Sequence, residues 1–402
     1  MENQHYNTDN HHNEVIYMEF VSGGVCAPQG FTANGVSCGL RADSQRRDLA
    51  LVVSSVPAVA SGVFSNAPQT GACVQVSRDH LRDHQAQAIL CNSGITSPGA
   101  KDDLEVARTL CGMVNHYTGI HTDNVVLSSV GPVGNNLDLK KVSSAMHNLY
   151  NGRSRNGGTA ADAIITRDTY KKETAVFFEL NGVKCTLGAM AKGCSMEKTD
   201  MANFLCFLTT DVAIVPELLD KAMNRVITRG FNMISMDRIA GPNDMAVILA
   251  NGLADNEPIA EEGPAYDLFL TALEKAVAQM CRLIAGDGEG ATKLLECRVA
   301  GAAGEAEAAS LAKTVAAHPG VRRMLYRGEA DLEALTAALG AAGEYDVSLS
   351  SAYGTVKLLE QGKRTDFDQD LADQIFMGKE IDVIVTLNQG SESATAWGCD
   401  RP

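Results

Sequence analysis

The sequence is poor in aromatic residues, in clustered cations and in long apolar runs. Aromatic residues make up 5% of the 402 residues and there is one Trp, so small side chains should pack the core. The net charge of −15 and the lack of a Lys/Arg-rich stripe argue against a nucleic-acid partner. No apolar run approaches the roughly 20 residues that span a bilayer. No secretory signal pattern is visible, so we expect a cytoplasmic protein without a membrane partner.

The eleven cysteines are odd in number, scattered, and without any C-x-x-C pair. This pattern is typical of reduced, buried thiols and not of a disulfide framework or a zinc site. Glycine, by contrast, is abundant with 37 residues, which favours many tight turns. A chain of this length exceeds the size at which one core stops growing, so we expect an α/β protein with two lobes.

Hydrophobic spacing predicts helices layered on sheets. Short β-branched runs bounded by turn residues predict strands at 48–56, 87–92, 124–130, 174–179, 183–187, 294–301, 347–350 and 382–387. Apolar residues at helical spacing predict helices at 101–117, 137–150, 215–229, 266–284 and 305–317. The segment 241–252 is also predicted to be a helix, with Asn243 or Asp244 near its N-terminus and Gly252 at its end.

Four loops that contain glycine adjoin predicted strands and form the first candidate site. They are residues 91–99, 128–136, 188–196 and 285–293. Binding residues are concentrated on such loops, and glycine lets the backbone approach a ligand closely. Its N–H groups then remain available to an anion or an oxyanion.

Eleven motifs follow one another in an order that is known from one family. They are GGVCAPQGFTANGVSCGLR, DLALVVSS, GVFSN, CNSG, SSVGPVG, ADAIITRDT, LGAMAKGCSM, MANFLCFLTTD, NDMAVILANG, GDGEGATK and LAKTV. Through them, residues 21 to 400 resemble the ornithine acetyltransferases (glutamate N-acetyltransferases) of arginine biosynthesis. The resemblance implies an α/β fold, an αββα sandwich with a second α/β lobe. We expect a disordered polar tail at 1–20, a core lobe at 21–275, and a C-terminal lobe with a truncated end at 276–402.

Members of this family are synthesised as a precursor that cuts itself before a Thr. The Thr hydroxyl attacks the preceding carbonyl, and the amine that is freed then activates the same hydroxyl. The Thr carries an acetyl group from N-acetylornithine to glutamate, and neither a metal nor a cofactor takes part. The resemblance therefore implies an amino acid or N-acyl amino acid as the ligand. It also suggests that the chain pairs with itself or with a related protein.

The segment AKGCSMEKTDMANFLCFLTTD (191–211) places Asn203 where the family has its Thr. An amide is not a usable nucleophile, because its nitrogen lone pair is delocalised. We therefore predict that the backbone between Ala202 and Asn203 stays intact. Without that cut there is also no α-amine at 203 to act as a base.

Two further motifs depart from the family pattern. In the oxyanion loop, Val130 stands beside Gly131 where the family has a hydroxyl donor; losing such a donor typically lowers the rate by about 100- to 1,000-fold. In the substrate loop, Arg167 follows Thr166 where a small hydroxyl normally stands. By contrast, Lys192 and Glu289 match family substrate-site positions, and this cation and anion suit an amino-acid zwitterion. The stretch 315–334 departs from the pattern as well.

These departures predict a divergent homologue, a pseudoenzyme that is not self-cleaved and that retains a pocket for its ligand. An engineered Thr-to-Asn change would explain Asn203 but neither Val130 nor Arg167. The alternative is an active acyltransferase or hydrolase of a specialised pathway. It would use the Cys194 thiol, for which Lys192 is the one evident activating cation, or direct attack by a substrate amine.

Overall fold

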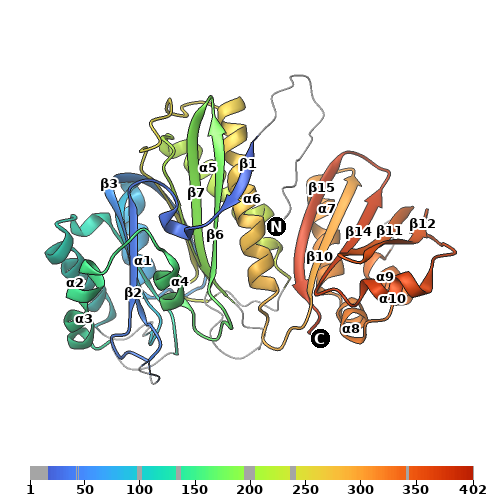
Figure 1. Cartoon of the computed structure of the whole chain (residues 1–402), viewed down its shortest axis with the longest axis horizontal. Helices are drawn as coiled ribbons and strands as arrows, with labels where there is room; N and C mark the ends of the chain where they lie inside the picture. Colours follow the sequence, from blue (N-terminus) through green and yellow to red (C-terminus); the bar gives the residue numbers. More distant parts are fainter. Residues whose placement is uncertain are drawn as a thin grey trace. The chain divides into compact units, whose positions relative to one another are not determined.

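The computed structural model shows a mixed α/β protein with two sheets (Figure 1). It describes residues 17–41, 43, 45–96, 102–132, 137–193, 204–235, 241–340 and 344–401. These residues form two compact units. Of the described residues, those up to 193 and those in 204–224 and 241–280 belong to the N-terminal unit, and those in 225–235 and 281–401 belong to the C-terminal unit.

The N-terminal unit is built on a nine-stranded sheet with the order β1-β6-β7-β8-β9-β3-β4-β5, and β2 pairs with β3. The strands are β1 (Met18–Val21), β2 (Phe31–Val36), β3 (Leu49–Phe64), β4 (Gln85–Asn92), β5 (Val125–Ser129), β6 (Lys172–Leu180), β7 (Val183–Lys192), β8 (Leu205–Thr210) and β9 (Met245–Ala250). The pairs β4–β5 and β8–β9 are parallel and the other pairs are antiparallel. The polar tail was expected to reach residue 20, but β1 begins at Met18.

The long strand β3 joins the two halves of this sheet. Its first half pairs with β2 and β4, and its second half pairs with β9. The register on β4 shifts between Val53 and Ala58, a stretch that contains Pro57. Proline cannot donate to a strand ladder and is tolerated at such bulges. The predicted strand ended at Val56 because Pro57 follows, but the chain continues as a strand past the bulge to Phe64.

Helices cover the strands of the N-terminal unit. They are α1 (Ala72–His80), α2 (Asp103–Thr118), α3 (Leu139–Asn151), α4 (Gly158–Ile164), α5 (Pro216–Arg229) and α6 (Pro264–Ala285), the last two of which end in residues of the C-terminal unit. α1 packs on β5, α2 packs on α1 and α3, and α4 packs on β2 and β3. α6 runs beside the β6–β7 hairpin in Figure 1, and its Lys275 donates to the Met18 carbonyl of β1 over 3.2 Å. This arrangement has the predicted αββα class with a second α/β lobe.

The predicted helix at 241–252 is wrong, because this segment forms strand β9. All six residues of β9 are buried, and the strand lies between β8 and β3. A strand that is covered on both faces has a continuous apolar run without alternation, which the sequence alone does not distinguish from a buried helix. Asn243 and Asp244 hold neighbouring loops and do not cap a helix.

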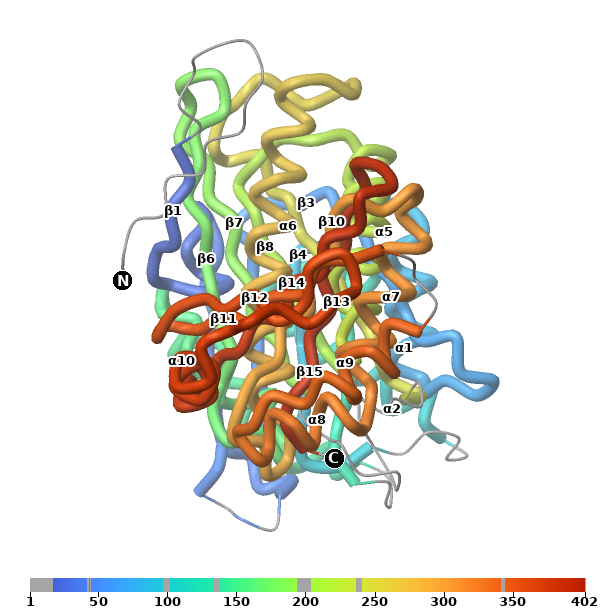
Figure 2. Tube along the Cα trace, turned by 90° about the vertical axis from the view of Figure 1, so that its right-hand side faces the viewer, coloured from blue at the N-terminus to red at the C-terminus, as the bar shows by residue number. Residues whose placement is uncertain are grey.

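The C-terminal unit contains a six-stranded sheet with the order β13-β12-β11-β14-β10-β15, in which only β10 and β14 are parallel. The strands are β10 (Leu294–Ala302), β11 (Tyr345–Ser351), β12 (Gly354–Glu360), β13 (Lys363–Arg364), β14 (Glu380–Leu387) and β15 (Glu392–Cys399). The helices are α7 (Glu305–Ala317), α8 (Pro319–Arg327), α9 (Leu332–Leu339) and α10 (Gln369–Ile375). α7 packs on β10 and β15, and α8 and α9 lie below strands β11 to β13 in Figure 2.

Candidate functional site

The loops after β4 and β5 meet at the carboxyl ends of this parallel pair. The Val130 N–H donates to the Asn92 carbonyl over 2.8 Å. Gly131 has a φ of 134°, and a Cβ there would lie 2.9 Å from the backbone of Gly94. Only glycine fits this conformation and this distance. Two of the four loops expected to form the site therefore lie in direct contact.

The two predicted oxyanion positions differ in what they can donate. The side chain of Val130 is fully buried and has no polar atom, and its N–H is taken by Asn92. The Gly131 N–H has no acceptor among the described residues. In the described part of this loop, the Gly131 N–H is therefore one donor that a ligand oxygen could accept from.

A buried carboxylate shapes the loop that precedes β3. Asp48 is fully buried, and its oxygens accept hydrogen bonds from the N–H groups of Cys38 at 2.6 Å, Leu40 at 2.7 Å and Arg41 at 3.2 Å. Three donors on one carboxylate fix the backbone in a tight turn and keep the charge solvated by amides. The turn sets the position of Arg41.

We predict that Asp48→Asn lowers the free energy of unfolding by about 1–3 kcal/mol. The amide retains one acceptor oxygen, so at least one part-buried N–H would lose its partner. Chemical denaturation of the two proteins measures the difference. Asp43→Asn is a suitable control, because Asp43 is exposed in the same loop and its carboxylate accepts the nearby Gln45 N–H. Equal loss of stability in both variants would contradict the assigned role of Asp48.

The predicted substrate loop at Thr166 is held by its backbone. The Arg41 guanidinium donates to the carbonyl of Ile165 at 2.6 Å and to that of Thr166 at 3.1 Å. The Thr166 N–H donates to Asp168 Oδ2 at 3.0 Å. Arg167 is exposed. The loop thus has a fixed backbone, with Thr166 half-buried and the long cation of Arg167 at the surface.

A buried ion cluster lies where this loop meets the end of β7. The side chains of Asp168 and Lys172 are inaccessible to solvent, and Lys172 Nζ lies 2.8 Å from Asp168 Oδ1. The same oxygen accepts the Gly193 N–H at 3.0 Å. Burial raises the pKa of the Asp168 carboxyl, but Lys192, Lys172 and the hydrogen bonds outweigh it and hold the pKa below its usual value. Asp168 therefore stays ionised and fixes the last turn of chain before residue 194.

Lys192 is the predicted substrate-site cation that the structure places most clearly. It is the last residue of β7 and is 3% exposed. Its ammonium is close enough to Asp168 to be the strongest of the influences that lower the pKa of that carboxyl. Asp168 therefore interacts with both predicted substrate-site residues: it accepts the Thr166 N–H, and it is close to the ammonium of Lys192.

The described cysteines do not offer an activated thiol. The ten cysteines in the described ranges are free and nine are buried, as the sequence predicted. Burial raises the pKa of Cys91 to about 12, although Lys192 acts in the opposite direction. Cys206 is fully buried in β8, and burial raises its pKa as well. Both behave as small hydrophobic residues.

Asn203 and Cys194 lie outside the described residues, but the chain is well fixed one residue after 203. The Phe204 N–H donates to Asp244 Oδ1 at 2.6 Å, and the Phe204 carbonyl accepts the Met245 N–H at 3.0 Å. Asp244 is itself buried. Strand β8 therefore begins from an anchored residue immediately after the predicted nucleophile position.

Glu289 belongs to the C-terminal unit, in the loop between α6 and β10. Asp400 holds this loop by accepting the N–H groups of Thr292 at 2.8 Å and Lys293 at 3.1 Å. Gly290 follows Glu289 with a φ of 76°, which glycine adopts without strain. The glycine-rich sequence here thus forms a firmly held turn, and a shared role of Glu289 with the residues of the N-terminal unit stays a prediction.

Sequence reasoning missed the residues that hold the site in shape. Asp48, Arg41, Asp168 and Asp244 all lie inside or beside the matched motifs. Asp48 accepts from residues 7 to 10 positions earlier, but the other three each have a partner 25 or more residues away. For Asp48, the available signal was a carboxylate directly before the apolar run LALVV (49–53). Within the described ranges, no group of three or more His, Cys, Asp or Glu is placed to hold a metal. No described helix is long and apolar enough to cross a bilayer.

Comparison with known proteins gives the class to which this fold and these motifs belong. The model of the ArgJ family matches residues 32–401. The arginine biosynthesis bifunctional protein ArgJ of Caldanaerobacter subterraneus subsp. tengcongensis is 36% identical over 391 residues, which cover 95% of this chain and 96% of that protein. The protein of the same name from Bacillus subtilis is 32% identical over 384 residues, covering 94% of each chain. The chain therefore belongs to the ArgJ family.

Solved structures from the same family are similar over part of the chain. The ArgJ crystal structure from Bacillus halodurans covers 47% of this chain and 100% of that chain, with 27% identity and a TM-score of 0.43. The ornithine acetyltransferase of Mycobacterium tuberculosis, crystallised with ornithine, covers 46% and 100%, with 26% identity and a TM-score of 0.42.

Proposed function

We propose that this family member binds an amino acid or N-acyl amino acid of the ornithine and glutamate type, and that it neither cuts itself nor transfers acetyl groups through a Thr. The observation that carries the proposal is Asn203, which stands in the motif MANFLCFLTTD where the family has its nucleophile. An acyl group on an amide would not form the ester on which that transfer depends. The apolar side chain of Val130 in the oxyanion loop supports the same conclusion.

The retained groups support a binding role. Lys192 offers a buried ammonium to a ligand carboxylate, and Asp168 keeps this end of β7 in place. Gly131 offers a backbone N–H to a carbonyl oxygen of the ligand, and Thr166 offers a hydroxyl. The role of Glu289 as a substrate-site anion is proposed from its motif alone. A cation and neutral donors suit the carboxylate and the acyl oxygen of such a ligand.

Lys192→Met should weaken the binding of N-acetyl-L-ornithine by about tenfold or more, because a hydrogen bond to a charged group typically contributes about 1.5–3 kcal/mol. Isothermal titration of the intact chain measures the change. Lys184→Met is the matched control, since Lys184 is an exposed lysine on the same strand. Thermal denaturation of both variants shows whether each is folded. Equal affinities for the two variants would contradict the proposed site.

The alternative is an active acyltransferase or hydrolase that uses Cys194 or direct attack by a substrate amine. Cys194 follows Lys192 by two residues, and a nearby cation favours a thiolate. Incubation with N-acetyl-L-ornithine and L-glutamate, followed by intact-mass analysis, separates the two functions. The proposal expects no acyl adduct and no N-acetylglutamate. An adduct that maps to Cys194 and is lost in Cys194→Ser, or turnover without an adduct, would establish the alternative.

A further inference from the structure

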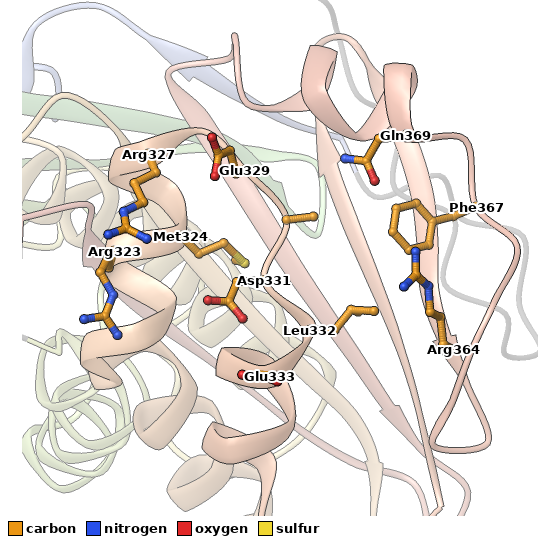
Figure 3. A pocket seen from close by; sticks show the side chains of 11 residues that line it. Arg323, Met324, Arg327, Glu329, Asp331, Leu332, Glu333, Arg364, Phe367 and Gln369 are labelled. Atoms are coloured by element: carbon orange, nitrogen blue, oxygen red, sulfur yellow. The ribbon is translucent and has the colours of Figure 1, made fainter.

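A hollow of about 280 Å³ in the C-terminal unit has charged side chains on different sides (Figure 3). Arg323 and Arg327 lie on one side and Arg364 lies on the other, with Asp331 between them in this view. In a small-molecule site, by contrast, a few polar groups converge on the ligand. The described side chains of this hollow are therefore not arranged around a single small ligand.

In the N-terminal unit, the side chain of Asn243 connects the loops after β4 and β5. Asn243 is fully buried, and its Nδ2 donates to Thr96 Oγ1 at 2.6 Å and to the Ser129 carbonyl at 2.9 Å. A Cβ at Gly71 would lie 2.2 Å from Asn243 Oδ1, so only glycine leaves room there for this amide. One amide group thus holds both loops of the candidate site.

The peptide group that precedes Gly131 is fixed at both of its polar atoms. The Ser129 carbonyl and the Val130 N–H belong to this one group. Its oxygen accepts from Asn243 Nδ2, and its N–H donates to the Asn92 carbonyl at 2.8 Å. Because a peptide group is planar, these two hydrogen bonds set the orientation of the chain as it enters Gly131.

The chain that follows Gly131 is fixed by the same loop contact. The Pro132 carbonyl accepts the Thr96 N–H at 3.1 Å, and the hydroxyl of Thr96 accepts from Asn243. Asn243 therefore acts on Gly131 from both sides, directly through residue 129 and indirectly through Thr96. The direction of the Gly131 N–H depends on this one side chain.

Asn243 itself stands on a firmly held backbone, immediately before β9. The next residue, Asp244, is buried, and its Oδ1 accepts the Phe204 N–H at 2.6 Å. The Asp244 carbonyl accepts the Ser65 N–H at 2.8 Å. Two consecutive residues thus hold the oxyanion loop and the start of β8, and so relate the position of Gly131 to that of the chain after residue 203.

We propose that Asn243 is a positioning residue. It holds the Gly131 N–H where the acyl oxygen of a ligand accepts from it, and so it gives the site a preference for N-acyl amino acids over free amino acids. The inference rests on the proposed function, in which Gly131 donates to that oxygen. A free amino acid has no acyl oxygen, so a misplaced Gly131 N–H would weaken only the N-acyl ligand. Groups that contact a ligand depend in this way on the residues that support them.

The test is isothermal titration of the full chain with N-acetyl-L-ornithine and with L-ornithine. Asn243→Leu removes both donors and keeps a side chain of similar size. It should weaken the binding of N-acetyl-L-ornithine by about three- to tenfold, as expected for one neutral hydrogen bond, and leave that of L-ornithine unchanged. Thr96→Val is a milder second variant, because it removes one acceptor and keeps the shape. It should weaken the same ligand selectively and by a smaller factor.

Asn256→Leu is the matched control. Asn256 is also a buried asparagine that holds a loop, since its Oδ1 accepts the Ala213 N–H at 2.8 Å and its Nδ2 donates to the Ala213 carbonyl at 3.2 Å. It follows β9, whereas Asn243 precedes that strand. Thermal denaturation shows whether each variant is folded. Equal weakening of both ligands by Asn243→Leu, or natural affinities in both Asn243→Leu and Thr96→Val, would overturn the proposal.

Hydrogen exchange distinguishes a failure of this inference from a failure of the proposed function. Mass spectrometry of the peptide that contains Val130 should show faster exchange in Asn243→Leu than in the natural chain or in Asn256→Leu, without any ligand. If the natural chain binds neither ligand, the proposed function is wrong, and the acyl preference is wrong with it. Faster exchange would then still support the positioning role, and unchanged exchange would overturn that role as well.

Discussion

A chain that carries both Asn203→Thr and Val130→Thr is expected to cut itself before residue 203 and to run as two fragments, each near half of its 42.6 kDa mass. The first change supplies the hydroxyl that attacks the preceding carbonyl. The second replaces a buried isopropyl group with a donor of the same shape in the oxyanion loop. The Gly131 N–H, already available there, supplies the second donor.

The single variants separate the two contributions. Asn203→Thr alone should be cut about 100- to 1,000-fold more slowly than the double variant, the usual effect of one oxyanion donor. Val130→Thr alone should remain intact, because position 203 is still an amide. A time course on denaturing gels gives the rates, and N-terminal sequencing identifies the cut. Cleavage of Val130→Thr alone, or a folded double variant that stays whole over long incubation, would contradict the roles assigned to residues 203 and 130.

Asp168→Asn is expected to lower the free energy of unfolding by about 3–5 kcal/mol. The change removes the carboxylate from two buried ammonium groups, Lys172 and Lys192, and breaking one side of a buried ion pair leaves an uncompensated charge. Asp162→Asn is the control, because that carboxylate is 39% exposed and lies 3.5 Å from Arg47. It should change stability by less than about 1 kcal/mol. Similar losses in the two variants would contradict the assigned role of the cluster.

The Asp168→Asn variant and the natural chain should also lose stability differently as the pH falls. The pKa of Asp168 is lower in the folded chain than in the unfolded chain, so its ionised form contributes stability above the unfolded pKa of about 4. That contribution is lost as the pH falls through the lower, folded pKa. Asp168→Asn has no carboxylate to protonate and should lose less stability below about pH 4 than the natural chain. If the free energy of unfolding fell equally with pH in the natural chain and in Asp168→Asn, protonation of Asp168 would not be the cause of the loss.

Long periodic segments could be predicted from the sequence, and short or fully buried ones could not. The helix predicted at 305–317 coincides with α7, and the strand predicted at 87–92 lies within β4. The error at β9 arose because a strand buried on both faces has no alternation to detect. Helices such as α8 and α10 went unpredicted, because nine and seven residues are too few for a clear period.

The sequence predicted which loops form the candidate site, but not the hydrogen bonds and ion pairs that connect them. Motif order indicated Gly131, Thr166 and Lys192, and the structure connects Thr166 and Lys192 through Asp168. The contribution of Asp168 depends on a backbone N–H 25 residues away, and that of Arg41 on carbonyls more than 120 residues away. Such partners are set by sheet topology, which no local pattern specifies.

The peptide bond between Ala202 and Asn203 should remain intact in the purified protein. Intact-mass analysis of the freshly purified natural chain should give a single species at 42.6 kDa with no acyl group attached. Two fragments, the second beginning at Asn203, would show that the chain processes itself without a hydroxyl at that position and would contradict the account.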